Sequence, residues 1–142
     1  GYFDEESNAQ VLGKMADRLR PGGRLVFDLY NRRYFKAVEW NSSTAARTIE
    51  QWIYASDLRY EDGRLTVRYS WESGDNDRFD WQLYAPDEMK ALGESLGLRE
   101  ILTCAEWKEG QVAGNRRRMF QMILEKPDPS SPAIEQPDSE PE

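Results

Sequence analysis

The feature that most constrains the fold is a proline and two glycines at residues 21–23, followed at once by the run RLVFDLY at 24–30. Proline cannot continue a helix, and glycine readily takes the positive φ of an exit turn. The run behind the turn is short, rich in residues that favour strands, and apolar on both alternating faces. This pattern is typical of a strand covered on both sides in a parallel sheet. We therefore expect a helix, a sharp turn and an interior strand of a larger sheet.

The residues before this turn have the pattern of an amphipathic helix. Apolar side chains recur at intervals of three and four, which puts them on one face, toward a core. The acidic residues at 4–6 suit the N-terminal end of such a helix, and Arg18 and Arg20 suit its C-terminal end. A helix followed directly by a buried strand is half of a strand–helix–strand unit, so the sequence predicts an α/β fold. The apolar stripe consists of Val11, Leu12, Met15, Ala16 and Leu19.

Residues 47–85 have a different pattern, in which aromatic and β-branched residues are mixed with polar neighbours. The sequences EDG at 61–63 and GDND at 74–77 are turn signals, so we expect an antiparallel β insert with one solvated face. Its aromatic side chains could form a lid that recognises an apolar acceptor, although such residues more often pack as cross-strand pairs. They are Trp52, Tyr54, Tyr69, Trp71, Trp81 and Tyr84.

A second helix and a hairpin are expected after the insert. Pro86 suits the first turn of a helix, and Gly97 suits its C-terminal stop. The strand-like segments at 98–107 and 116–126 are joined by KEGQVAGN, so they should pair as a hairpin. The core candidates in these strands are Ile101, Met119, Phe120, Met122 and Leu124.

The formal charge of −7 belongs mostly to the C-terminal tail. Residues 127–142 contain five acidic residues, five prolines and no Lys or Arg; removing those five acids from 26 leaves 21 against 19 basic residues. Such a segment cannot bury enough surface to offset the entropy of ordering, so we expect a disordered, acidic, Pro-rich tail. The body carries no basic stripe, and we therefore expect no nucleic-acid partner.

The chain has a single cysteine, Cys104, and no histidine. An internal disulfide is thus impossible, the usual zinc sites cannot be built, and we expect no metal site and a buried Cys104. The first residues, GYFDEES, lack the basic start and apolar stretch of a secretory signal. No window approaches the ~18 apolar residues of a membrane span, so we expect a cytoplasmic protein without a membrane partner.

Three segments taken in order, LRPGGRLVFDLYN, LYAPDEMKALGESLGL and RRRMFQMILEKP, resemble the C-terminal half of class I S-adenosylmethionine-dependent methyltransferases of the small-molecule type. The resemblance covers roughly residues 1–126. It implies the C-terminal part of a Rossmann-like, doubly wound sheet with an antiparallel insert at 47–85, in one partial domain of residues 1–126 that precedes the tail at 127–142. It also implies S-adenosylmethionine as cofactor and a small molecule as methyl acceptor.

The same resemblance predicts that part of the cofactor site lies outside this sequence. The family holds its cofactor chiefly by a glycine-rich loop after the first strand and an acidic residue at the end of the second, and both would lie upstream of Gly1. A loop of that kind works through close backbone approach and helix N-terminal amides, whereas the glycine pair here follows a helix end of the wrong polarity. We expect a truncated methyltransferase that is inactive alone.

Candidate site residues cluster after the predicted strand, because ligands of open α/β sheets gather beyond the carboxyl ends of the strands. Tyr30 and Asn31 would reach the rim of that crevice, followed by Arg33 and Tyr34 as further substrate-binding candidates. Tyr30 and Asn31 could instead form an ordinary exit turn. Methyl transfer is an in-line displacement that depends on positioning in a water-poor cleft, so no catalytic residue is assigned.

Three further side chains are candidates, with plain structural alternatives. The resemblance places Tyr2 and Phe3 against the cofactor, although large aromatic residues usually pack in the core. It also places Arg118 ahead of the last strand as a substrate contact, although it could be a solvated flank. Asp28, Tyr30 or Tyr34 could accept a proton from the methyl acceptor. For Asp28, hydrogen bonding to nearby backbone amides is the commoner role of such an acid.

Two other classes of function remain open from the sequence. The chain could be a non-enzymatic α+β module that binds an apolar ligand on a curved aromatic sheet, without a cofactor. It could also be an interaction protein that completes its sheet by joining another chain.

Overall fold

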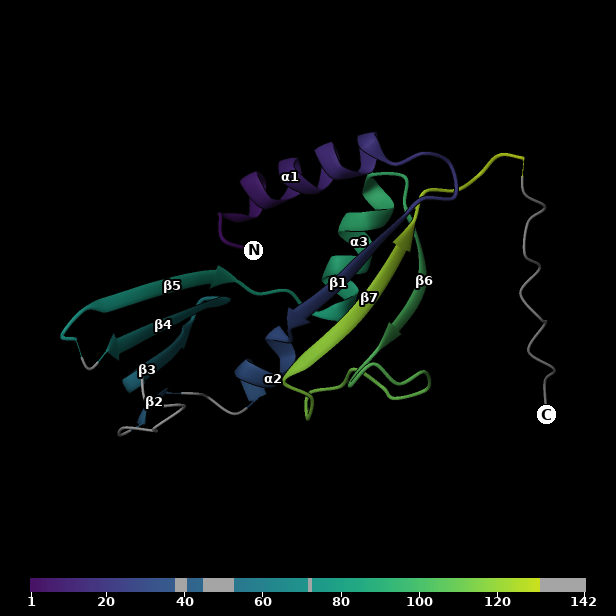
Figure 1. Ribbon diagram of the computed structural model, residues 1–142. Coiled ribbons are helices and arrows are strands. Elements are labelled where there is room, and N and C mark those ends of the chain that lie inside the picture. The colour runs from purple at the N-terminus through teal and green to yellow at the C-terminus, as the bar shows by residue number, and fades with distance from the viewer. Residues whose placement is uncertain (38–40, 45–52, 72, 131–142) are drawn as a thin grey trace, which may run out of the picture.

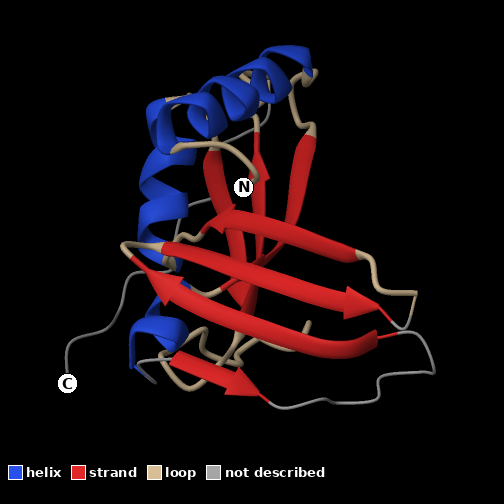
Figure 2. Cartoon of the chain, turned by 90° about the vertical axis from the view of Figure 1, so that its left-hand side faces the viewer, coloured by secondary structure: helices blue, strands red, loops and turns tan. Residues whose placement is uncertain are grey.

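The computed structural model describes residues 1–37, 41–44, 53–71 and 73–130. They form two antiparallel sheets, one three-stranded in the order β1-β7-β6 and one four-stranded in the order β2-β3-β4-β5 (Figure 1). The helices are α1 (Glu5–Arg18), α2 (Arg32–Ala37) and α3 (Pro86–Ser95). The strands are β1 (Arg24–Tyr30), β2 (Asn41–Thr44), β3 (Ile53–Glu61), β4 (Arg64–Trp71), β5 (Asn76–Gln82), β6 (Arg99–Cys104) and β7 (Met119–Glu125). The strands of the second sheet run across the direction of the first (Figure 2).

The predicted helix, turn and strand at the start of the chain are confirmed. The Asp4 side chain caps α1 by accepting a hydrogen bond from the Ser7 amide at 2.7 Å. Gly22 has a φ of 74°, which glycine adopts without steric cost. The Gly22 amide donates to the Lys126 carbonyl at 2.8 Å, so the turn is tied to the end of β7 before β1 begins.

The prediction that β1 is covered on both faces is wrong for the described residues. β1 lies at the edge of its sheet, paired antiparallel with β7 from Arg24↔Glu125 to Tyr30↔Met119. Leu25, Phe27 and Leu29 pack against the core, but Val26 on the other face is 58% exposed. The cause is that α1 and α3 both lie on the same side of this sheet (Figure 2).

The core lies between α1, α3 and the first sheet. Phe120, Met122 and Leu124 are fully buried, as predicted, together with Leu12 and Ala16 of α1. Ile101 is 39% exposed, so its assignment to the core is wrong. The pairing of β6 with β7 shifts register between Glu100 and Leu102, and this irregularity turns Ile101 outward.

The hairpin turns predicted in the insert are present. Asp62 and Gly63 have φ values of 49° and 80°, which join β3 to β4, and Gly74 has a φ of 88° before β5. One face of this sheet buries Leu65 and Val67 together with Phe35 of α2. Trp52 and the side chain of Tyr54 fall outside the described part of the chain, as do residues 131–142 of the predicted tail.

Candidate functional site

The carboxyl end of β1 meets the second sheet in a cluster of aromatic rings. The Tyr30 ring lies 5.8 Å from the Phe35 ring, edge to face, and 5.8 Å from the Trp81 ring. The Arg118 Cζ atom lies 5.3 Å from the Tyr30 ring centroid, a cation–π distance. Tyr30 is thus held in one orientation by neighbours from α2, β5 and the loop before β7.

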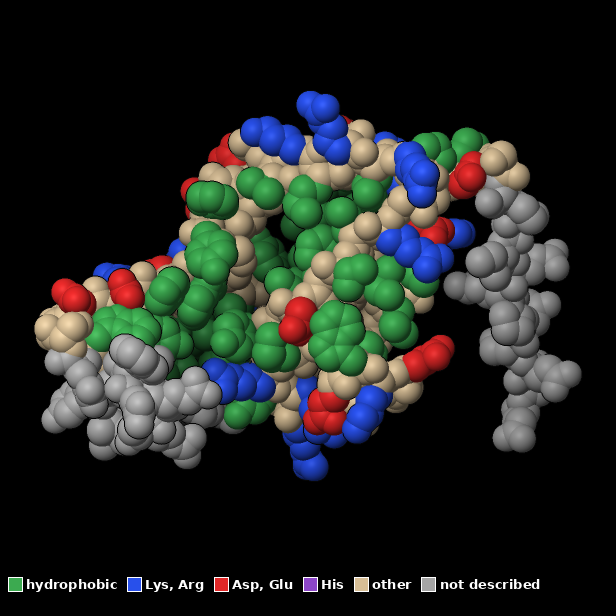
Figure 3. All heavy atoms as spheres, viewed as in Figure 1, with side chains coloured by type: hydrophobic (Ala, Val, Ile, Leu, Met, Phe, Trp, Pro, Cys, Tyr) green, Lys and Arg blue, Asp and Glu red, His purple; other side chains and the backbone are tan. Residues whose placement is uncertain are grey.

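Trp81 connects this cluster to a row of rings along β5. Its ring stacks on Phe79 at 5.6 Å with an interplanar angle of 8°, and Phe79 lies 5.8 Å from Tyr69 on β4. The Tyr2 ring lies 6.1 Å from Trp81 on its other side. We call Tyr2, Tyr30, Trp81, Phe79 and Tyr69 the aromatic row. Hydrophobic side chains gather over the insert and below α1, and the surface between them is hollowed (Figure 3).

Asn31, the residue after Tyr30, is fully buried and helps to hold this cluster in place. Its Nδ2 atom donates to the carbonyls of Gly114 at 2.9 Å and Arg117 at 3.1 Å, and its Oδ1 atom accepts from the Arg33 amide at 3.0 Å. Its backbone amide donates to the Arg118 carbonyl at 2.9 Å. Asn31 therefore anchors the loop that contains Arg118 at the start of α2. Its role is to position this loop, and its side chain is not exposed.

Arg33 and Tyr34 follow on α2 but point to different neighbours. The Arg33 guanidinium pairs with Asp87 on α3 at 3.0 Å. The half-buried Tyr34 packs edge to face on Phe35 at 5.3 Å. Tyr34 thus joins the cluster through Phe35, whereas Arg33 helps to anchor α2 to α3.

Tyr2 and Phe3 are not core residues, since they are 67% and 54% exposed. Tyr2 belongs to the aromatic row through Trp81. The cofactor-binding candidate Tyr2 and the substrate-binding candidate Tyr30 therefore contact the same indole ring. Phe3 is held by its backbone, because its carbonyl accepts a hydrogen bond from Asn8 Nδ2 at 2.8 Å. Its ring is left to solvent.

A second hollow, an apolar crevice of ≈ 130 Å³, opens between α1, β1 and α3. The Tyr84 hydroxyl is buried there, beside the Asn8 side chain. Burial raises the pKa of Tyr84, which keeps the hydroxyl protonated and able to donate. The residues around it include Leu12, Met15, Phe27, Leu29, Met89 and Leu92.

Sequence reasoning named Trp81 and Tyr84 only among the six aromatic residues of a possible lid, and it did not connect them with Tyr30 or Asn31. A signal for Trp81 exists in the alternation FDW at 79–81, which puts two aromatic rings on one face of a strand. Tyr84 stands directly before the predicted start of a helix, and its backbone forms a parallel bridge with Asn31. That bridge joins segments distant in sequence, so no local pattern predicts it.

The remaining candidates have structural partners. Asp28 Oδ1 accepts a hydrogen bond from Gln121 Nε2 at 2.6 Å, so its partner is a side chain rather than the backbone amides expected. Cys104 is 1% exposed, which confirms its predicted burial.

Within the described ranges, no group of three or more acidic or cysteine side chains is arranged to hold a metal ion. None of the helices described here is long and apolar enough to cross a bilayer.

The fold was compared with known proteins. No protein-family model matches the sequence, and no curated protein matches it. A solved structure of an S-adenosylmethionine-dependent methyltransferase from Clostridium acetobutylicum superimposes on 87% of this chain with a TM-score of 0.72 and 10% identity. The chain has the fold of the C-terminal part of a class I methyltransferase. The methyltransferase CcbJ from Streptomyces caelestis matches 85% of the chain with a TM-score of 0.64 and 13% identity.

The chain spans about half the length of these methyltransferases, 52% of the first and 53% of the second. The fold class predicted from the sequence is thereby confirmed, including its resemblance to a methyltransferase fragment. The N-terminus of α1 carries Asp4, Glu5 and Glu6, and this negative charge opposes the binding of a cofactor carboxylate.

Proposed function

We propose that this chain is the acceptor-side part of an S-adenosylmethionine-dependent methyltransferase that acts on a small molecule. The observation that supports it best is the aromatic row, which begins beside Tyr30 at the carboxyl end of β1 in a methyltransferase fold. Residues outside this sequence would hold most of the cofactor, and the chain alone would be inactive. A cytoplasmic location, with no nucleic-acid or membrane partner, belongs to the same proposal.

The aromatic row suits the needs of methyl transfer. In-line displacement at a sulfonium methyl group requires an acceptor held at the right distance and angle in a water-poor cleft. Tyr30 is fixed by Phe35 at its edge and by Arg118 over its face, so it offers a rigid wall. Trp81 and Phe79 extend this wall along β5 and would bind the apolar part of the acceptor.

A direct test uses the longer protein read from the coding DNA upstream of Gly1. That frame should contain a glycine-rich loop behind an apolar strand, and the longer protein should release S-adenosylhomocysteine with a small apolar acceptor. Trp81→Ala should raise the KM for the acceptor more than it changes cofactor affinity, since Trp81 lies in the aromatic row. Trp107→Ala, at a residue that is 61% exposed outside this row, is the matched control. Equal losses in both variants would contradict the assignment.

A second candidate function is a module that binds an apolar ligand without a cofactor. Phe79 favours it, because a ring that is 36% exposed and stacked on Trp81 already offers an apolar surface. An apolar fluorescent probe such as N-phenyl-1-naphthylamine distinguishes the two. Micromolar binding by the chain alone that is lost in Phe79→Ala, with no methyl transfer by the longer protein, would favour the module.

A further inference from the structure

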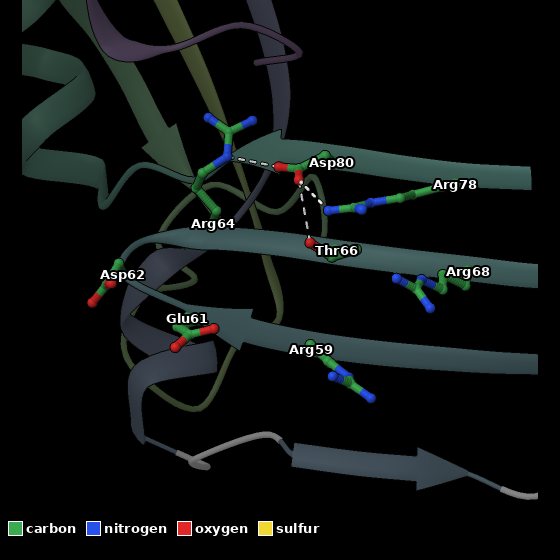
Figure 4. A pocket seen from close by; sticks show the side chains of 8 residues that line it. All are labelled: Arg59, Glu61, Asp62, Arg64, Thr66, Arg68, Arg78 and Asp80. Carbon is green, nitrogen blue, oxygen red and sulfur yellow. Dashed lines mark hydrogen bonds and ion pairs between the residues drawn. The ribbon is translucent and has the colours of Figure 1, made fainter.

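The outer face of the insert sheet carries a hollow lined by arginines. Side chains at alternate positions of β3, β4 and β5, together with Asp62 of the β3–β4 turn, enclose a volume of ≈ 370 Å³ on this face (Figure 4). They are Arg59, Glu61, Asp62, Arg64, Thr66, Arg68, Arg78 and Asp80. The intervening residues Leu65 and Val67 are buried with Phe35 on the opposite face. The hollow is therefore separated from the aromatic row by the thickness of the sheet.

Charges are sorted along this hollow. Arg59, Arg68 and Arg78 lie toward one end, which we call the arginine end, and Glu61 and Asp62 lie at the other, beside the β3–β4 turn (Figure 4). Arg68 and Arg78 are direct register partners. Directly opposed residues in antiparallel strands have Cβ atoms about 4.5–5.5 Å apart, and like charges at that distance destabilise the pair.

The Asp80 carboxylate is shared between two arginines of the hollow, Arg64 and Arg78. Asp80 is partly desolvated, but its hydrogen bond and ion pair with Arg64 at 2.6 Å outweigh this and lower the pKa of Asp80, so it is charged at neutral pH. The same carboxylate also accepts from Arg78 at 3.3 Å and from Thr66 at 3.3 Å. Asp57 occupies the register position opposite Arg68 on β3, and Glu61 occupies the one opposite Arg64. At the arginine end, Arg68 and Arg78 thus lie in direct register, and Arg78 shares the Asp80 carboxylate with Arg64.

We propose that the arginine end binds the phosphate group of a small soluble ligand. A planar guanidinium presents paired N–H donors that match phosphate oxygens, and a dianion placed between Arg68 and Arg78 relieves their repulsion. The volume of ≈ 370 Å³ falls in the range of small-molecule sites, about 300–1,000 Å³. The rest of the ligand extends over Thr66 toward Glu61 and Asp62, where hydroxyl or amino groups can donate to the carboxylates.

The same geometry favours a small phosphate compound over a nucleic acid. A nucleic-acid strand places a phosphate at every step, so a second phosphate would meet Glu61 and Asp62 at the acidic end. A monophosphate ester places its one negatively charged group at the arginine end, and its neutral or cationic groups can then lie at the acidic end. This site is independent of methyl transfer, because it lies on the opposite face of the sheet.

Titration of the full chain with inorganic phosphate at constant ionic strength tests this proposal, with the arginine Nε–Hε resonances followed by NMR. The signals of Arg68 and Arg78 should shift in a saturable manner, and pyrophosphate should bind at the same place. Arg68→Gln and Arg78→Gln should each weaken binding by about tenfold or more, because each removes charge-assisted hydrogen bonds. Arg68→Lys, which keeps the charge and loses the paired donors, should fall between Arg68→Gln and the parent.

The matched control is Arg18→Gln, at an exposed arginine in the last turn of α1, which should leave phosphate binding unchanged. Circular dichroism melts verify that each variant is folded. Phosphate affinities that do not differ between Arg68→Gln and Arg18→Gln would overturn the proposal. It would also be overturned if a short oligonucleotide shifted these signals while phosphate and pyrophosphate did not.

Discussion

Substitution of Asn31 tests how the candidate site is held together. Asn31→Ala removes two well-formed hydrogen bonds to the carbonyls of Gly114 and Arg117 and the acceptor of the Arg33 amide. A neutral hydrogen bond contributes about 0.5–1.5 kcal/mol net, so the loss of three should cost about 2–3 kcal/mol of unfolding free energy. This is a large share of the 5–15 kcal/mol that is typical of a domain.

Asn31→Asp sharpens the test because it keeps the shape and changes the chemistry. Its carboxylate can still accept from the Arg33 amide, but it can no longer donate to the carbonyls, and its charge would be fully buried. The aspartate pKa in the folded state is therefore raised above its unfolded value. The variant should be most stable at low pH, where the carboxyl is protonated, and should lose stability as pH rises through that pKa.

Urea denaturation followed by circular dichroism measures both effects. At pH 7 we expect the order parent, Asn31→Ala, Asn31→Asp, from most to least stable. Asn115→Ala, at an exposed residue of the same loop, is the matched control and should change the unfolding free energy by less than about 0.5 kcal/mol. A loss below that value in Asn31→Ala, or an Asn31→Asp variant as stable as the parent at pH 7, would refute the reasoning.

Three other predictions concern the frame around the site. Gly93→Ala should destabilise the protein by about 1–3 kcal/mol in thermal unfolding, because the new Cβ atom would lie 2.5 Å from Leu124 Cδ1; an unchanged Tm would show that α3 can shift away from β7. Hydrogen bonds from Arg99 and Arg24 lower the pKa of Glu125 from its ordinary value of 4.5. These hydrogen bonds therefore stabilise the folded protein above pH 4.5, and the stabilisation is lost as pH falls through the lower pKa of the folded state. Glu125→Gln should thus be less stable than the parent at pH 7 and approach it in acid, and a difference that does not depend on pH would contradict this. Because unpaired strand edges pair with other chains, the edge strand β1, on which Val26 is 58% exposed, should make the parent chain self-associate in sedimentation velocity. Val26→Lys should reduce this association and leave the melting temperature nearly unchanged; undiminished association would mean that the exposed edge is not its cause.

Local signals predicted much of the fold. Pro21, Gly22 and Gly23 end a helix and start a strand for reasons that lie within a few residues, and the structure has both elements there. The same holds for Asp62 and Gly63, whose positive φ values join two strands in a tight turn. Signals of this kind do not depend on what the rest of the chain does.

Features that depend on distant residues were not predicted. The exposure of Val26 follows from α1 and α3 lying on one side of the sheet, and that of Ile101 follows from a register shift against β7. The burial of Asn31 depends on carbonyls more than eighty residues away in sequence. The role of Trp81 likewise needs Tyr2 and Tyr30 to approach it from separate segments.

Isothermal titration calorimetry with S-adenosylmethionine tests the central claim most directly, using this chain and the longer protein that includes the upstream frame. The account predicts no heat of binding for this chain, because it proposes that residues outside this sequence hold most of the cofactor, and micromolar binding for the longer protein. Micromolar binding by this chain alone, or none by the longer protein, would contradict it.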